Sequence, residues 1–393
     1  MKVTFLAYNI YGVGGTVRTI VNTANELVKN GHDVEIISVK RTSPRPTFAL
    51  DRSVKLRPLL DARKGKLYHA GMKAPVKWVK RFLLKRRSVL IDKTEDLYPL
   101  FSLFTDIQLY RVLKRLKTDV FVTTIPSFNL LSAKWVDPKI KRIGQEHSQF
   151  NVHSQELQAK MRQAYPKLDA MMLLSEEEMA AYAAEFGERL RLYRVENATE
   201  MPDVRSTLDK KVILSAGRIS HEKGFDRLIE AFDLIKDDYP DWQLHIYGDG
   251  EEKPALRELI FERECYNQVF LHPKTNALPR KMQDASIYAL ASRYESFGMV
   301  LIEAMALGVP CVSFDIKGPA AIITHETDGL LAPEGDIEAF AAQLRRLIES
   351  DELRHRLAEG AVRRSRDYST EVIGQKWETL LHEVAPQAFK KKR

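Results

Sequence analysis

The chain has 393 residues, 44% of them hydrophobic and 29% charged, a balance typical of a folded protein with two or three domains. This composition excludes a disordered or collagen-like chain, and no apolar run approaches the roughly 20 residues that cross a bilayer. The net charge of +8 is localised, because ten basic residues and no acid lie between Asp61 and Asp92, and the tail at 390–393 adds four more.

The first half of the chain alternates apolar strands with amphipathic helices. Residues 2–8 predict a strand, a cluster of glycines follows, and apolar positions at helical spacing over 16–29 predict a helix. A strand over 33–39 then completes a βαβ unit, which implies a parallel sheet with a right-handed crossover. Further buried strands, each ending in polar residues, are predicted at 119–125, 141–147 and 169–175.

A second series of strands and helices follows a predicted linker over 197–210, which is poor in apolar residues and contains a proline. Strands are predicted at 211–219, 243–250, 269–273, 286–292 and 309–314, and helices at 225–240, 277–284 and 299–307. Open parallel sheets bind ligands beyond the carboxyl ends of their strands. We therefore expect the ligand in a cleft between two such domains.

The glycine loop after the first strand is a candidate phosphate site. Gly12, Gly14 and Gly15 precede a helix, so their backbone N–H groups can approach a phosphate that the helix dipole favours. The alternative is a simple tight turn. A dinucleotide fingerprint requires glycine where Val17 stands and an acid after the second strand, where Lys40 and Arg41 stand, so an NAD site is not favoured.

Two cations mark the loop that opens the second half. Arg218 and Lys223 lie between the strand over 211–219 and the helix that begins near Phe225. Arginine offers a planar fork and lysine a mobile point charge, so together they suit a diphosphate leaving group. The alternative is a pair of solvated loop cations.

Two glutamates eight residues apart form the third motif. Glu295 precedes a predicted helix, residues 296–299 are expected to form its first turn, and Glu303 lies about two turns further along. The N–H groups of that first turn can receive an anion, and the carboxylates can hold vicinal hydroxyls of sugars at the two ends of a sugar nucleotide. The alternative is that both are ordinary capping or surface residues.

These motifs resemble the retaining glycosyltransferases of family 4, which have the two-domain GT-B fold. The resemblance covers nearly the whole chain, and the Glu-x7-Glu element with its trailing EAMALGVP at 303–310 is its most specific part. It implies an α/β fold with two Rossmann-like parallel-sheet domains facing across a cleft. The implied organisation is an acceptor-binding domain over 1–196, a linker over 197–210, a nucleotide-sugar-binding domain over 211–371, and a helix with a basic tail over 372–393 that packs back on the first domain.

The resemblance also implies roles for the second-half motifs. Arg218 and Lys223 resemble the pair that binds the donor diphosphate, Glu303 the residue that holds the ribose, and Glu295 the one that contacts hydroxyls of the donor sugar. The remaining members of this predicted donor site are Ser296, Phe297, Gly298 and Met299. The expected catalytic residues are Glu295, His147, Arg218 and Lys223.

Three further segments are matched by the resemblance. Gly14 and Gly15 resemble the segment that faces the phosphates and the acceptor. His147 resembles a histidine that faces the donor sugar at a strand end, although a lone histidine can also be structural. The base is expected near His272, Pro273 and Lys274, in a loop that lacks the glycine common in the family. No Asp-x-Asp metal motif is present, so no metal and no cofactor are expected.

The basic segment over 62–88 interleaves Trp78, Val79, Phe82, Leu83 and Leu84 with cations. This composition suits a helix on anionic lipid or on an anionic polymer, and the alternative is a solvated helix face. Nucleic acid is not favoured because no binding module accompanies the charge. The start of the chain lacks a signal peptide, so we expect a cytoplasmic protein, peripheral on the inner face of the plasma membrane if this segment binds lipid.

The implied activity is transfer of a hexose or N-acetylhexosamine from a nucleotide diphosphate sugar, with UDP expected, to a hydroxyl of a cell-envelope glycan, a teichoic-acid-like polymer or a lipid-linked acceptor. No residue stands out as a covalent nucleophile, and the resemblance implies a same-face displacement with retention. One alternative is a sugar-nucleotide epimerase on the same fold, against which the Glu-x7-Glu element argues. The other is a catalytically silent glycan- or polymer-binding module, against which the intact Arg218, Lys223, Glu295 and Glu303 argue.

Overall fold

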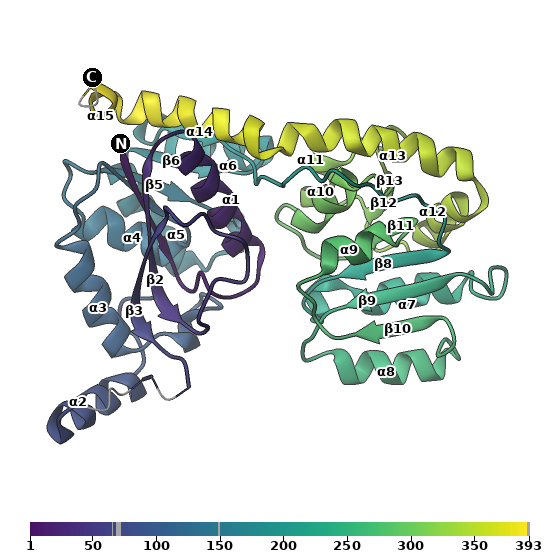
Figure 1. Cartoon of the computed structure of the whole chain (residues 1–393), viewed down its shortest axis with the longest axis horizontal. Coiled ribbons are helices and arrows are strands. Elements are labelled where there is room, and N and C mark those ends of the chain that lie inside the picture. The colour runs from purple at the N-terminus through teal and green to yellow at the C-terminus, as the bar shows by residue number, and fades with distance from the viewer. Residues whose placement is uncertain (65, 68–71, 148–149, 391–393) are drawn as a thin grey trace. The chain divides into compact units, whose positions relative to one another are not determined.

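The computed structural model describes residues 1–64, 66–67, 72–147 and 150–390, and the chain divides into two compact units. One unit comprises Met1–Ala198 and Ile373–Arg393, and the other comprises Thr199–Val372. Each is a parallel sheet covered by helices (Figure 1). The α/β class expected from the sequence is therefore confirmed.

The sheet of the first unit has the strand order β3-β2-β1-β4-β5-β6-β7, and every pairing is parallel. Its strands are β1 (Lys2–Ala7), β2 (Asp33–Arg41), β3 (Lys55–Asp61), β4 (Val120–Thr123), β5 (Lys141–Gln145), β6 (Ala170–Leu173) and β7 (Leu192–Arg194). Its helices are α1 (Gly15–Lys29), α2 (Ala74–Lys85), α3 (Leu103–Leu113), α4 (Pro126–Trp135), α5 (Gln155–Ala164), α6 (Glu176–Phe186), α14 (Thr370–Val384) and α15 (Pro386–Lys390). Central positions such as Val3, which pairs with Val34 and Val120, are fully buried, as parallel sheets require.

The sheet of the second unit has the order β10-β9-β8-β11-β12-β13 and is also parallel throughout. Its strands are β8 (Val212–Ala216), β9 (Gln243–Tyr247), β10 (Val269–His272), β11 (Ile287–Leu290), β12 (Cys311–Phe314) and β13 (Leu330–Ala332). Its helices are α7 (Phe225–Asp233), α8 (Lys253–Glu262), α9 (Leu278–Gln283), α10 (Met299–Ala306), α11 (Lys317–Ile322), α12 (Ile337–Glu349) and α13 (Asp351–Ser365).

Both sheets reverse their strand order at one point, between β1 and β4 in the first unit and between β8 and β11 in the second. Loops that leave neighbouring strands at such a reversal diverge, which is why open α/β sheets bind ligands there. The glycine loop, residues 12–15, comes after β1. The Arg218 loop, residues 217–224, follows β8, and the Glu295 loop, residues 291–298, follows β11. Three of the sequence motifs therefore lie at the reversal points.

The last helix contributes to the core of the first unit. Trp377 on α14 is only 2% exposed, and its ring meets the edge of Phe5 on β1 with 5.9 Å between centroids. Leu380 and Leu381 belong to the same core cluster. This packing assigns the chain from Ile373 onward to the first unit, although that unit is otherwise made from the first half of the sequence.

Several elements differ from expectation. The strands β3, β7 and β13 were not predicted, because each lies at the edge of its sheet and is short or carries charged residues and a proline. The helix α7 ends at Asp233 rather than Pro240, and the chain continues in tight turns such as Ile235 N–H to the Phe232 carbonyl. The segment 197–210 is anchored on the second unit from Thr199, and the Ser206 hydroxyl donates to the Ala285 carbonyl across 2.7 Å.

Candidate active site

In the second unit, the loops over 217–224 and 291–298 leave β8 and β11 and touch each other through their backbones. Gly224 has φ +61°, a left-handed conformation that glycine adopts without strain. A Cβ atom at this position would lie 2.0 Å from the carbonyl oxygen of Ala291. Only glycine permits this approach, so the sequence Lys223-Gly224 fixes where the lysine stands relative to the second loop.

Side chains join the same two loops. The ammonium of Lys223 donates a hydrogen bond to Glu295 Oε2 across 2.7 Å, and the two side chains are only 19% and 15% exposed. The same ammonium lies 3.6 Å from Glu222 Oε1. Arg218 is largely exposed and lies 3.4 Å from Glu222 Oε2. The two predicted diphosphate ligands therefore converge on Glu222, an acid that the sequence analysis did not single out.

Arg293 forms a second bridge between the loops. Its Nη1 donates to the His221 carbonyl across 2.9 Å and to Asp226 Oδ1 across 2.8 Å. The backbone N–H of Arg293 donates to the Glu222 carbonyl. Burial works to raise the pKa of Asp226, but the hydrogen bonds and charge of Arg293 hold that pKa below its ordinary value. These contacts of Arg293 tie the loop over 291–298 to the loop over 217–224 and to the start of α7.

The helix α10 begins at Met299, so the expectation that residues 296–299 form its first turn is wrong for Ser296 and Phe297. Gly298 caps the helix with φ +100°, and this left-handed residue ends the loop before the helical hydrogen bonds begin. No described side chain caps this end, and the first turn carries no acid. The first N–H groups of α10 are thus suited to an anion, and Glu303 lies four residues after Met299.

The two predicted glutamates lie around one buried phenol. Tyr288 on β11 exchanges hydrogen bonds with the backbone of Ala216 at 3.3 Å, which joins β8 to β11 under the loops. Burial raises the pKa of Tyr288, and the nearby charges of Glu303 and Glu295 act in the same direction. Glu303 is 7% exposed, and Glu295 is held at its carbonyl by the N–H of Gly318 at 3.1 Å. Glu295 precedes α10 and Glu303 lies within it, so both residues follow the carboxyl end of β11 in the chain.

An aromatic stack lies where the base was expected. The His272 ring stacks on Tyr247 with 4.4 Å between centroids and on His245 with 4.9 Å, and His272 Nε2 is 3.0 Å from His245 Nδ1. Burial lowers the pKa of His272 and lowers that of His245 to about 4, so both rings are neutral at pH 7. Pro273 and Lys274 follow the stack and are exposed. Tyr247 and His245 lie on β9 and were missed, since side chains within a strand carry no functional signal of their own.

In the first unit, the glycine loop presents open backbone. Gly14 and Gly15 are exposed, and Gly14 caps α1 with φ +144°, a conformation that favours glycine. Among the described residues, no side chain caps α1, and the first turn of this helix carries no acid. A Cβ atom on Gly14 would meet nothing within 4 Å. The loop is therefore sterically free to admit a ligand group close to its N–H groups.

His147 follows β5 and is partly buried. Burial lowers the pKa of His147 to about 4, so the imidazole is neutral at pH 7. Its Nε2 atom is buried and has no hydrogen-bond partner among the described residues. A neutral imidazole with an open nitrogen can donate to or accept from a hydroxyl group, which is compatible with its expected position beside the donor sugar.

The neighbour of His147 was missed by the sequence analysis. Glu146 is 1% exposed, and its Oε1 accepts hydrogen bonds from Asn129 Nδ2 across 2.8 Å and from the Tyr165 hydroxyl. Burial raises the pKa of Glu146 to about 8, so the carboxyl group keeps its proton at neutral pH. Burial likewise raises the pKa of Glu95 to about 7. Glu146, the residue directly before His147, is therefore a buried carboxyl group, and the sequence alone does not show that burial.

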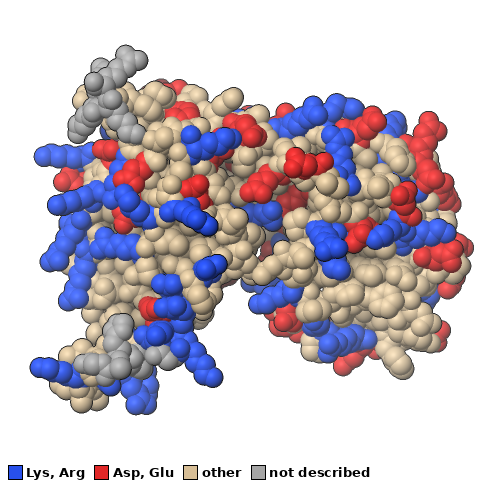
Figure 2. All heavy atoms as spheres, in the orientation of Figure 1, with Lys and Arg blue, Asp and Glu red and all other residues tan. Residues whose placement is uncertain are grey.

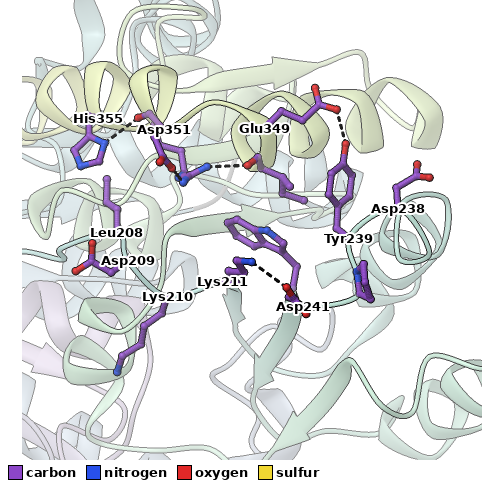
Figure 3. A pocket seen from close by; sticks show the side chains of 14 residues that line it. Leu208, Asp209, Lys210, Lys211, Asp238, Tyr239, Asp241, Glu349, Asp351 and His355 are labelled. Carbon is purple, nitrogen blue, oxygen red and sulfur yellow. Dashed lines mark hydrogen bonds and ion pairs between the residues drawn. The ribbon is translucent and has the colours of Figure 1, made fainter.

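A cavity of about 530 Å³ lies at the amino ends of β8 and β9, opposite the loops described above. Figure 3 shows two pairs among its lining side chains, Lys211 with Asp241 and Tyr239 with Glu349. None of the site residues proposed from the sequence lines this cavity, so it is not the candidate site. Within the described ranges, no three His, Cys, Asp or Glu side chains are grouped so as to hold a metal ion.

Two parallel-sheet units with polar loops at their strand-order reversals are the architecture of the GT-B glycosyltransferases. Two family models match nearly the whole chain between them, Glycosyltransferase Family 4 over residues 13–199 and Glycosyl transferases group 1 over residues 197–364. The chain belongs to the family 4 glycosyltransferases, as the sequence motifs indicated.

Two relatives are similar in sequence over nearly the full chain. An exopolysaccharide phosphotransferase of Streptomyces coelicolor is 32% identical over 98% of this chain, which spans only 41% of that relative. An uncharacterized glycosyltransferase of Haemophilus influenzae is 29% identical over 97% of this chain and 99% of its own length. Among solved structures, a mutant of S. aureus TarM in complex with fondaparinux, α-GlcNAc-glycerol and UDP matches with a TM-score of 0.76 and 17% identity, covering 97% of this chain and 99% of TarM.

Proposed function

We propose that the chain is a retaining glycosyltransferase that moves a hexose or N-acetylhexosamine from a nucleotide diphosphate sugar to a hydroxyl group of a cell-envelope acceptor. The observation that carries the proposal is the contact between Lys223 and Glu295 at the reversal point of the second sheet. An ammonium there suits a diphosphate leaving group, and a carboxylate suits the hydroxyls of the sugar attached to it.

In the proposed reaction, the acceptor oxygen bonds to the anomeric carbon on the face from which the diphosphate oxygen departs, so the configuration is retained. The acceptor proton passes to that departing oxygen. Arg218, Lys223 and the uncapped start of α10 stabilise the negative charge that grows on the diphosphate as its bond breaks. These groups supply the positive charge that a divalent cation supplies elsewhere, and the proposed enzyme is therefore independent of metal.

Two observations support a UDP-sugar donor. The structural neighbour TarM was solved with UDP. The rings of Tyr247 and His272 offer a partly exposed stacking surface at the strand ends where the base was expected. In this proposal Pro273 and Lys274 contact the base, Glu303 holds the ribose, and Gly14, Gly15 and His147 position the donor sugar and the acceptor.

The proposed acceptor is a hydroxyl of an envelope glycan, of a polyol phosphate polymer or of a lipid-linked precursor. The Streptomyces relative is named an exopolysaccharide phosphotransferase, and TarM was solved with α-GlcNAc-glycerol. Both observations support acceptors of this kind. The proposed location is the cytoplasm, because Cys265 and Cys311 are both free and buried, as is common where thiols stay reduced.

A thermal-shift screen of UDP, GDP, ADP, TDP and CMP with their sugar conjugates tests the donor. Binding at a hundred times Kd stabilises the folded state by about 2.7 kcal/mol, so one nucleotide family should raise Tm, and EDTA should not abolish the effect. Radiolabelled sugar transfer to a hydroxyl acceptor then tests the reaction. Sugar interconversion without an acceptor would identify an epimerase, and the absence of any nucleotide effect would favour a binding module.

A further inference from the structure

The helix α2, Ala74–Lys85, is unlike the other described helices of eight residues or more, because none of its residues is buried. It projects from the first unit and contacts α3 along one side (Figure 1). It exposes Trp78, Val79 and Phe82, which are 68%, 46% and 44% exposed and lie within about 100° of one another around the helix axis. Large apolar side chains gathered on one exposed helix face indicate a binding surface rather than scattered surface residues.

The orientation of α2 is set by its contacts. Lys80 turns toward the body of the unit, where its ammonium donates to the Leu67 carbonyl across 2.5 Å and lies 5.2 Å from the centre of the Phe104 ring of α3. Trp78 and Phe82, four residues apart and so on one face, turn outward with their rings stacked at 5.9 Å. The aromatic face therefore points away from the protein.

Cations surround this aromatic face. Arg81, Lys85 and Arg86 are exposed, and the Arg86 guanidinium lies 4.9 Å from the centre of the Phe82 ring. Figure 2 shows basic side chains gathered over this part of the first unit, and the sequence has no acid between Asp61 and Asp92. The surface thus combines an apolar band with uncompensated positive charge.

We propose that α2 docks the protein on an anionic lipid bilayer. The helix would lie in the plane of the interface, with Trp78, Val79 and Phe82 at the boundary of the acyl chains and Arg81, Lys85 and Arg86 at the lipid phosphates. A soluble polyanion would satisfy the cations but would leave the aromatic face in water, so the bilayer explains both halves of the surface. No described helix is long and apolar enough to cross a membrane, and α2 supplies attachment of another kind. This inference is independent of the sugar donor.

Cosedimentation of the full chain with vesicles of phosphatidylcholine, with and without phosphatidylglycerol, tests the proposal. We expect binding only to the anionic vesicles and a loss of that binding at high salt. Trp78 is the exposed one among the four tryptophans, so a blue shift of the emission should accompany binding and vanish in Trp78→Ala. The combination of Arg81→Gln, Lys85→Gln and Arg86→Gln should lower the partition coefficient roughly a hundredfold, since each cation contributes about fivefold at an anionic surface.

The matched controls are Phe261→Ala and Arg257→Gln on α8. Phe261 is 74% exposed but lies between Glu258 and Glu262, so its removal should not affect vesicle binding. Because α2 contributes nothing buried, its variants should keep the wild-type Tm and the wild-type response to nucleotides. The proposal is overturned if Trp78→Ala with Phe82→Ala binds vesicles like wild type. It is also overturned if these variants lose only binding to soluble polyol phosphate, or if they change only the oligomeric mass in light scattering.

Discussion

Lys223 donates a hydrogen bond to Glu295 across 2.7 Å, and this contact joins the loop that leaves β8 to the loop that leaves β11. Both side chains are mostly buried, so the pair is screened little by solvent. The carboxylate orients the ammonium before any ligand arrives, and the ammonium in turn holds the carboxylate at the reversal point of the sheet. The pair is therefore preorganised for a ligand that carries both negative charge and hydroxyl groups.

We expect Glu295→Ala to lower the rate of transfer by roughly a hundredfold to a thousandfold while leaving nucleotide binding nearly intact. The carboxylate is proposed to hold the sugar rather than the phosphates, and loss of one preorganised polar group at a reacting centre lowers kcat by roughly a hundredfold to a thousandfold. Radiolabelled transfer and calorimetry with the donor nucleotide measure the two effects separately. Transfer at the wild-type rate would refute the assignment of Glu295.

Replacing Lys223 should weaken nucleotide binding, which Glu295→Ala leaves nearly intact. We expect Lys223→Met to weaken nucleotide diphosphate binding by roughly tenfold to a hundredfold, because a hydrogen bond to a charged group is lost. Calorimetry in the presence of EDTA gives the change without a contribution from metal. Lys210→Met, at the opposite edge of the sheet and paired with Asp284, is the matched control and should bind like wild type. Equal weakening by both would show that only the general charge matters.

Adding Glu295→Gln to Lys223→Met completes a double-mutant cycle. The cycle is measured on binding of the intact sugar nucleotide. If the two side chains act as a unit there, the effects of the two changes are not additive, and the coupling free energy should exceed about 0.5 kcal/mol. Additive effects would mean that the contact in the unliganded protein has no part in holding the donor.

The central strands of both sheets were predictable because a parallel sheet with helices on both faces requires continuous apolar runs. The edge strands β3 and β7 escaped prediction, since Pro58 and the polar ends of both resemble loop sequence. The predicted helix range 299–307 agrees with α10. Placing Ser296 and Phe297 in its first turn was wrong, because the positive φ of Gly298 cannot be inferred from residue type alone.

The candidate site was only partly visible in the sequence. Spacing suggested Lys223 and Glu295, but nothing in it shows that their side chains meet. Tyr288 looked like an ordinary core residue of a strand, and its hydrogen bonds to Ala216 depend on the pairing of β8 with β11. Residues that act through tertiary contacts carry no local signal, so the supporting residues of the site emerge only from the fold.

The C-terminal helix gives a stability prediction. Trp377 is buried against Phe5, and truncation of a large buried aromatic side chain costs roughly 3–5 kcal/mol. We expect Trp377→Ala to lower the stability of the first unit by about that amount. Urea unfolding followed by circular dichroism measures it, and Val372→Ala, at a 36% exposed position just before the first unit's segment of α14, should change stability little. A Trp377→Ala protein as stable as wild type would contradict the packing of α14 on β1.

Glu146 predicts how stability depends on pH. Burial raises the pKa of its carboxyl group from 4.5 to about 8, so the folded protein retains a proton that the unfolded chain releases. The contribution of this group to stability is fully present below pH 4.5 and is lost as pH rises through 8. The pKa of His147 is lowered from 6.5 to about 4, so the contribution of that ring is present above pH 6.5 and is lost as pH falls.

Between pH 6.5 and 8 the contribution of His147 is constant, and Glu95, whose pKa is raised by burial to about 7, titrates in the wild type and in Glu146→Gln alike. In this window the free energy of unfolding of the wild type should fall with pH more steeply than that of Glu146→Gln, with a difference of at most about 1.4 kcal/mol per pH unit. Urea unfolding at closely spaced pH values measures both slopes. The exposed Glu188→Gln in the same unit is the control and should keep the wild-type slope. Parallel curves for the wild type and Glu146→Gln would show that Glu146 is ionised in the folded protein, and the hydrogen-bond network with Asn129 and Tyr165 would then require a different protonation.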